Sequence, residues 1–170
     1  MLRFSVFRSF ITTLVLMAAI DIPVGATVTM TGDVDPGGAT DPWALDEALY
    51  VGKDNDGILN IKAGGVISNT KGYIGYKSDS SGEVTVTGED SQWYNSSSLY
   101  IGGGTSAAGG HGVLNIKDSA RVIVSNSTKL WSTGTVNLNG GILDARTLDL
   151  TEGIFDMLDG RLHADIIIGD

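Results

Sequence analysis

The amino-acid sequence predicts an all-β protein, and it favours a parallel β-helix (β-solenoid) of about five to six coils. Two observations carry this prediction. A glycine-led pattern of alternating apolar and polar residues occurs five times in the 170 residues, and no helical periodicity is found after about residue 50. A β-sandwich is the alternative, because short strands with frequent turns also fit that fold.

The repeated pattern is first seen as GILNI, which begins at Gly57. Its third and fifth positions are apolar in every copy and its fourth is polar, which is the alternation of a half-buried strand. We therefore expect Leu59 and Ile61 to face the interior and Asn60 to face outward. The copies begin at Gly57, Gly82, Gly112, Gly134 and Gly153. Such matched columns favour stacked coils, whereas a hairpin-connected sandwich would not need them.

Residues 1–26 have the features of a signal peptide. Arg3 and Arg8 make a short basic start, an apolar run follows over residues 10–20, and small residues end at Ala26. The run is short for a membrane helix, which needs about 20 apolar residues. We expect cleavage after Ala26, which leaves no membrane span in the mature chain; a retained N-terminal anchor is the alternative.

Residues 27–48 are expected to form an N-terminal strand and cap. Residues 27–34 alternate like a strand, and residues 35–38 (DPGG) have the composition of a turn. Residues 41–48 fit a single helical turn with Asp41 as the N-cap, or equally an irregular loop. Either would cover one end of the stack.

A second motif interleaves with the first over the expected β-helix repeat domain, residues 49–170. LYVG at residues 49–52 returns as GYIG at 72–75, as LYIG at 99–102 and, in altered form, as IIIG at 166–169. The linkers are rich in turn residues, with a flexible glycine-rich stretch from Gly102 to Gly112. The last strand would present unpaired backbone groups, so end-to-end self-association is expected.

The combined motifs resemble a known family. The order LYVG, GILNIKAGGVIS, GYIG, GEVTVTGEDSQW, LYIGG and GVLNI over about residues 43–124 is similar to the PEP-CTERM and type V secretion (autotransporter)-associated repeat of bacterial exported proteins. Residues 134–170 resemble autotransporter-associated β-strand repeats. The resemblance implies a right-handed β-helix in an exported bacterial protein of the periplasm, the cell surface or the extracellular medium. It implies no catalytic residues.

Together these patterns predict a secreted or cell-surface structural and adhesive module that is not an enzyme. Its expected partners are extracellular glycans or surface proteins. The formal net charge of −9 would repel phosphate backbones, so no nucleic-acid partner is expected. The chain has no cysteine, so an exported form depends on packing without disulfides. The alternative is a carbohydrate-binding or polysaccharide-degrading β-helix protein.

No catalytic, cofactor-binding or metal residues are predicted, and no cofactor. The sequence Asp54-Asn55-Asp56-Gly57 begins like an EF-hand loop, but its twelfth position is Gly65 where a glutamate is needed. Turn chemistry explains these aspartates better. Loose surface calcium remains an alternative at four turn carboxylates: Asp54, Asp56, Asp79 and Asp90. The two histidines, His111 and His163, have no zinc-site spacing, and no GxSxG elbow is present.

Two further groups of residues deserve a structural test. A degrading enzyme would need clustered carboxylates and a basic group, and the nearest set is Lys117, Asp118 and Arg121, which we interpret as solvated turn charges. Tyr50, Tyr73 and Tyr100 occupy equivalent positions of the LYVG motif. They would either form one outer column able to grip sugars or a partner, or pack inside or over a corner of the coils. We favour the second arrangement, because large rings bury much area there.

Overall fold

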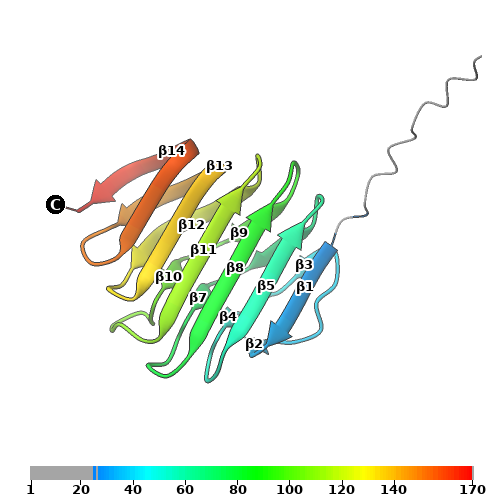
Figure 1. Ribbon diagram of the computed structural model, residues 1–170, viewed down its shortest axis with the longest axis horizontal. Helices are drawn as coiled ribbons and strands as arrows, with labels where there is room; N and C mark the ends of the chain where they lie inside the picture. Colours follow the sequence, from blue (N-terminus) through cyan, green and yellow to red (C-terminus); the bar gives the residue numbers. More distant parts are fainter. Residues whose placement is uncertain (1–24, 26, 170) are drawn as a thin grey trace, which may run out of the picture.

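The computed structural model describes Gly25 and residues 27–169. The predicted signal peptide, residues 1–26, lies outside the described residues except for Gly25. The described chain is all-β, which confirms the predicted class: it contains 14 strands and no helix, joined in one sheet. None of the described residues forms a helix long and apolar enough to cross a membrane. Figure 1 shows the strands standing side by side along the long axis, from β1 to β14, with the sheet folding back behind its front row.

The front row of Figure 1 carries the five glycine-led copies. They lie on β5 (Gly57–Lys62), β8 (Ser81–Thr87), β11 (His111–Lys117), the first part of β13 (Gly134–Asp149) and the first part of β14 (Ile154–Ile168). Each of these strands pairs with the next in parallel. The third positions of the pattern face one another across the row: Leu59, Val84, Leu114, Val136 and Phe155.

Two further rows complete the sheet. One contains β3 (Trp43–Ala44), β6 (Val66–Asn69), β9 (Gln92–Asn95) and the first part of β12 (Arg121–Leu130). The other contains β2 (Val34–Asp35), β4 (Leu49–Val51), β7 (Gly72–Ile74), β10 (Leu99–Ile101) and the last part of β12. The long strands β13 and β14 continue through all three rows.

The strand directions are mixed, which differs from an all-parallel arrangement. β1 (Thr27–Gly32) pairs antiparallel with β5, and β2 pairs antiparallel with β4. All the other strand pairs between named strands are parallel. β1 and β2 precede the first copy of the pattern, and they cover the edges that β5 and β4 would otherwise expose.

The core lies between the three rows and is built from the apolar columns. Leu59 and Ile61 have no exposed surface, and the same is true of Leu114 and Ile116. The column of fifth positions ends at β14, which among residues 27–169 has a neighbouring strand on one side only, and Met157 is therefore 46% exposed. Burial of a Leu or Ile side chain contributes roughly 1.5–3 kcal/mol, so these columns are the main source of stability.

The polar residues at the fourth position of the pattern lie on the outer side of the front row, as expected for Asn60. They are not all exposed to solvent. Asn115 is only 8% exposed. Its Nδ2 donates to Glu83 Oε1 at 3.0 Å, and its Oδ1 accepts from Asn137 Nδ2 at 2.9 Å. Over β8, β11 and β13 the column is therefore a hydrogen-bonded ladder, in which Asn115 also donates to Thr85 Oγ1 at 3.3 Å.

The glycine that ends each LYVG-type motif is required by the backbone. Gly52, Gly75 and Gly102 all have a positive φ, of 73°, 68° and 80°. A Cβ atom on Gly52 would lie 2.3 Å from the backbone oxygen of Ser81, which belongs to β8, the front-row strand that pairs with β5. The motif therefore marks the corner at which the chain turns tightly past its neighbour.

The helical turn considered for residues 41–48 is wrong. Trp43 and Ala44 form β3, which pairs in parallel with β6. The Asp41 carboxylate accepts a hydrogen bond from the Val66 amide at 3.1 Å, so it bonds to the neighbouring strand and caps no helix. Trp43 is 5% exposed, and burial of this large side chain against the core favours the extended backbone over a local turn.

Candidate functional site

Tyr50, Tyr73 and Tyr100 form one outer column. They lie in register on β4, β7 and β10, and the residues on either side of Tyr50 and Tyr100 point into the core. The ring centroids of Tyr50 and Tyr73 are 4.7 Å apart with planes 8° apart, and those of Tyr73 and Tyr100 are 5.2 Å apart with planes 14° apart. The structure combines the two arrangements considered from the sequence, because the rings stack in an outer column while Tyr73 within it is buried.

Most of the ring surface in this column is used for packing within the protein. Tyr76 meets Tyr50 and Tyr73 edge-on, at 5.2 and 5.3 Å between centroids. Tyr73 is only 6% exposed, and burial raises the pKa of its hydroxyl to about 12. Lys53 lies over the Tyr50 ring at 4.8 Å from its centroid. Each aromatic pair contributes about 0.5–1.5 kcal/mol beyond its area burial, so the column is first a stabilising element.

The tyrosine column ends at Tyr100, where the residues that continue across the sheet are no longer aromatic. The next residue across the sheet is Lys129, followed by Asp149 and then Ile168. Tyr73 stacks on one face of Tyr100, and the aliphatic and charged residues of β12–β14 follow on the other side. This end opens into a cavity of about 340 Å³. The cavity is lined by Tyr100, Thr105, Ser127, Lys129, Trp131, Thr147, Asp149 and Ile168.

An ion-paired lysine, Lys129, lines this cavity. Lys129 Nζ lies 3.0 Å from Asp149 Oδ2 and 3.5 Å from Glu152 Oε1. It also donates to Thr151 Oγ1 at 3.1 Å and lies over the Trp131 ring at 4.7 Å from its centroid. Burial raises the pKa of Asp149, but hydrogen bonds from Lys129 and Thr151 outweigh this, and the pKa is lowered overall.

The glycine-rich stretch from Gly102 to Gly112 contributes Thr105 to the cavity lining. Gly103 and Ala108 are joined by an antiparallel bridge, and the Gly104 amide donates to the Ala107 carbonyl at 3.0 Å. Trp131 Nε1 donates to the Gly104 carbonyl at 2.8 Å. The sequence suggested flexibility here, but these bonds hold the loop against Trp131 and place Thr105 at the edge of the cavity.

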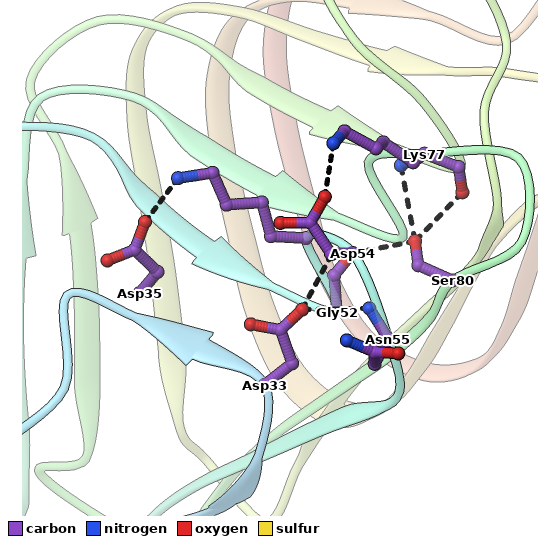
Figure 2. Close-up of polar contacts among 8 residues, drawn as sticks. Asp33, Asp35, Gly52, Asp54, Asn55, Lys77 and Ser80 are labelled. Carbon is purple, nitrogen blue, oxygen red and sulfur yellow. Dashed lines mark hydrogen bonds and ion pairs between the residues drawn. The ribbon is translucent and has the colours of Figure 1, made fainter.

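The turn aspartates do not converge on a metal site. Figure 2 shows Asp33 turned toward the Asp54–Asn55 turn, where its carboxylate accepts both backbone amides, at 2.6 and 2.8 Å. These bonds, led by that of Asp54, lower the pKa of Asp33. Asp54 is itself paired with Lys77. Within residues 27–169, no group of three or more histidine, aspartate or glutamate side chains is placed to hold a metal ion.

The set Lys117, Asp118 and Arg121 is divided between different contacts. Asp118 accepts a hydrogen bond from the Thr87 hydroxyl at 2.7 Å. Arg121 Nη2 pairs with Asp144 Oδ2 at 3.0 Å, on the neighbouring strand β13. The structure therefore directs Arg121 and Asp118 to different partners.

Two polar clusters were not anticipated from the sequence. Asp144 joins Arg121 to His163, whose Nδ1 lies 3.0 Å from Asp144 Oδ1; the hydrogen bond to His163 and then that to Arg121 lower the pKa of Asp144. The second cluster is buried. Trp93 Nε1 donates to Asn69 Oδ1 at 2.7 Å, and Asn69 Nδ2 donates to Asn95 Oδ1 at 2.9 Å.

The signal for the buried cluster was present in the sequence. Asn69 ends VISN and Asn95 ends QWYN, so each asparagine closes a short strand of the second row. The Arg121–Asp144–His163 cluster joins three separate strands, and only the register of β12, β13 and β14 reveals it.

Comparison of the chain with protein-family models, curated proteins and solved structures finds no match. The function is therefore inferred from the sheet, from the tyrosine column and from the cavity at the end of that column.

Proposed function

We propose that this chain is an exported structural and adhesive module of a bacterial surface, built as a right-handed β-helix of about five to six coils and without catalytic activity. The observation that carries the proposal is the in-register parallel pairing of the five glycine-led strands. Each copy adds the same apolar column to the core and the same polar column to the outside, which is how stacked repeats build a rod.

The bonding pattern supports a mechanical role. Backbone hydrogen bonds between neighbouring strands run along the stack, and the Asn115 ladder and the tyrosine column run in the same direction. Five strands spaced by about 4.8 Å span on the order of 20 Å. A rod of this kind is stiff without disulfides, which suits an exported chain that has no cysteine.

Export is supported by the basic and apolar segments of residues 1–26 and by the resemblance to autotransporter-associated and PEP-CTERM-associated repeats. The test is to express the full chain in a bacterium and to sequence the N-terminus of the protein recovered from the medium, the cell surface and the periplasm. The proposal predicts that the recovered protein begins at Thr27. Retention of the intact chain in the cytoplasm would contradict it.

The competing function is polysaccharide degradation. The separate contacts of Asp118 and Arg121 support a non-catalytic role, because they engage these groups with different partners. Purified protein incubated with pectin, alginate and cellulose should release no new reducing ends or unsaturated products. Robust cleavage of any of the three polysaccharides would overturn the proposed structural role and indicate an enzyme.

The proposal includes end-to-end association with a second copy through β14. This strand is 15 residues long, and within the part of the chain that the structure describes it pairs with β13 alone. Leu158 and Ile167 on it are 79% and 57% exposed. A second copy of β14 running antiparallel would satisfy its free backbone groups by two-fold symmetry. Sedimentation should show dimers that increase with concentration and decrease in an Ile167→Lys variant; a monodisperse monomer at high concentration would exclude this association.

A further inference from the structure

We propose that the cavity at the Tyr100 end of the tyrosine column binds one unit of a neutral polysaccharide. This inference rests on the proposed function, because it supplies the surface through which an exported rod would adhere. A ligand site is typically a concave pocket of about 300–1,000 Å³ with apolar walls and a few fixed polar groups. The cavity of about 340 Å³ lies at the lower end of that range, which suits a single sugar ring with its neighbours extending along the surface.

The apolar wall is the ring of Tyr100. Tyr73 covers one face of Tyr100, and the cavity lining includes Tyr100 together with Lys129, its neighbour on the side away from Tyr73. An aromatic face of this kind can pack against the C–H face of a pyranose, and its hydroxyl remains able to form hydrogen bonds at the ring edge. Trp131 provides a second aromatic edge, which its bond to the Gly104 carbonyl keeps in place.

The polar groups around these rings suit the hydroxyls of a sugar. Thr105, Ser127 and Thr147 belong to the lining, and a hydroxyl can both donate and accept. The Ser127 hydroxyl already donates to Ser98 Oγ at 3.2 Å, so it would meet a sugar as an acceptor. The Lys129 and Asp149 side chains are 17% and 23% exposed, so they are partly buried yet still reachable from the cavity. Because the pair is held by several bonds, its oxygens and nitrogen are fixed in place before a ligand arrives.

The charges favour a neutral ligand. Lys129 faces two carboxylates, Asp149 and Glu152, so the local formal charge is negative. A uronic acid or a phosphate would meet net repulsion there, which the overall charge of −9 reinforces. A cationic ligand is also disfavoured, because the Lys129 amino group already occupies the cation position over the Trp131 ring.

The test is affinity electrophoresis of the full exported chain in gels that contain β-glucan, xylan or mannan, compared with gels that contain alginate or polygalacturonate. We expect retardation by at least one neutral polymer and none by the acidic ones. The matching hexasaccharide should change the tryptophan fluorescence. Such a change reports on Trp131, because Trp43 and Trp93 are 5% and 0% exposed in the core.

Two variants and one control locate the site. Tyr100→Ala should weaken binding of the hexasaccharide at least tenfold, and Thr147→Val should weaken it severalfold with little effect on folding. Tyr50→Ala removes a stacked ring from the other end of the column and serves as the control for lost aromatic packing; it should bind like the parent. Melting curves confirm that each variant is folded.

Three results would overturn the inference: binding of none of the neutral polymers, preference for the acidic ones, or equal loss of binding in Tyr50→Ala and Tyr100→Ala. Failure of the proposed function would be recognised separately, because it would be seen as cleavage of a polysaccharide or retention of the intact chain in the cytoplasm.

Discussion

Two adjacent residues of the first repeat, Ile58 and Leu59, provide a matched test of the column assignment. Leu59 has no exposed surface, whereas Ile58 is 43% exposed. Truncation of either side chain to alanine removes the same number of carbon atoms, three. For Leu59 the lost transfer energy is about 2.4 kcal/mol at about 0.8 kcal/mol per group. The cavity left in the core brings the total to about 3 kcal/mol or more.

Ile58→Ala should cost only about 1 kcal/mol, because much of the side chain is already in water and solvent fills the space it leaves. The free energies of unfolding are measured by urea titration, with tryptophan fluorescence as the signal and equal slopes required for comparison. A difference between the two variants of less than about 0.5 kcal/mol would refute the assignment of alternate residues to core and surface.

Three other perturbations test the polar contacts. Asp144→Asn should make stability less dependent on pH in acid. Because the pKa of Asp144 is lowered in the folded state, its ionised form stabilises the fold at pH values above its ordinary pKa of 3.8, and this stabilisation is lost as the pH falls through the lower folded-state pKa. A urea midpoint that varies with pH below about pH 4 as it does in the parent would exclude the ion cluster. Asn69→Ala should cost about 1–3 kcal/mol by leaving the buried Trp93 Nε1 without its acceptor; a cost near zero in urea titration would contradict that network. Asn115→Asp should lower stability by about 0.5–1 kcal/mol through repulsion from Glu83, and Glu83→Gln should restore it; additive effects in the double variant would show that the two groups do not interact.

The sequence predicted the strands of the front row well because their pattern reflects a local property. Alternation in GILNI follows from the pleat of a strand, so the burial of Leu59 and the outward direction of Asn60 could be inferred without knowing the neighbouring strands. The stacking of Tyr50 on Tyr73 was open to prediction for a related reason, since equivalent positions of a repeat meet when the copies pair in register.

Other features depend on contacts between distant residues, which a local pattern does not contain. The helical propensity considered for residues 41–48 was overridden by the burial of Trp43 beside β6. The antiparallel direction of β1 could not be inferred from its alternation, because alternation is the same for either strand direction. The cavity beside Tyr100 requires the glycine-rich loop to be held by Trp131, a bond between residues 27 positions apart.

The central claim is that successive copies of the glycine-led strand lie side by side in register, and cross-linking tests it most directly. The chain has no cysteine, so a pair introduced as Ile58→Cys and Glu83→Cys would be the only thiols. These residues face each other across β5 and β8, at a strand spacing of about 4.8 Å that a disulfide can bridge. Mild oxidation should give an intramolecular disulfide in this variant and none in Ile58→Cys with Thr87→Cys, which is displaced by about 13 Å along the strand. Equal cross-linking of the two pairs, or none in the first, would contradict the stacking of the repeats.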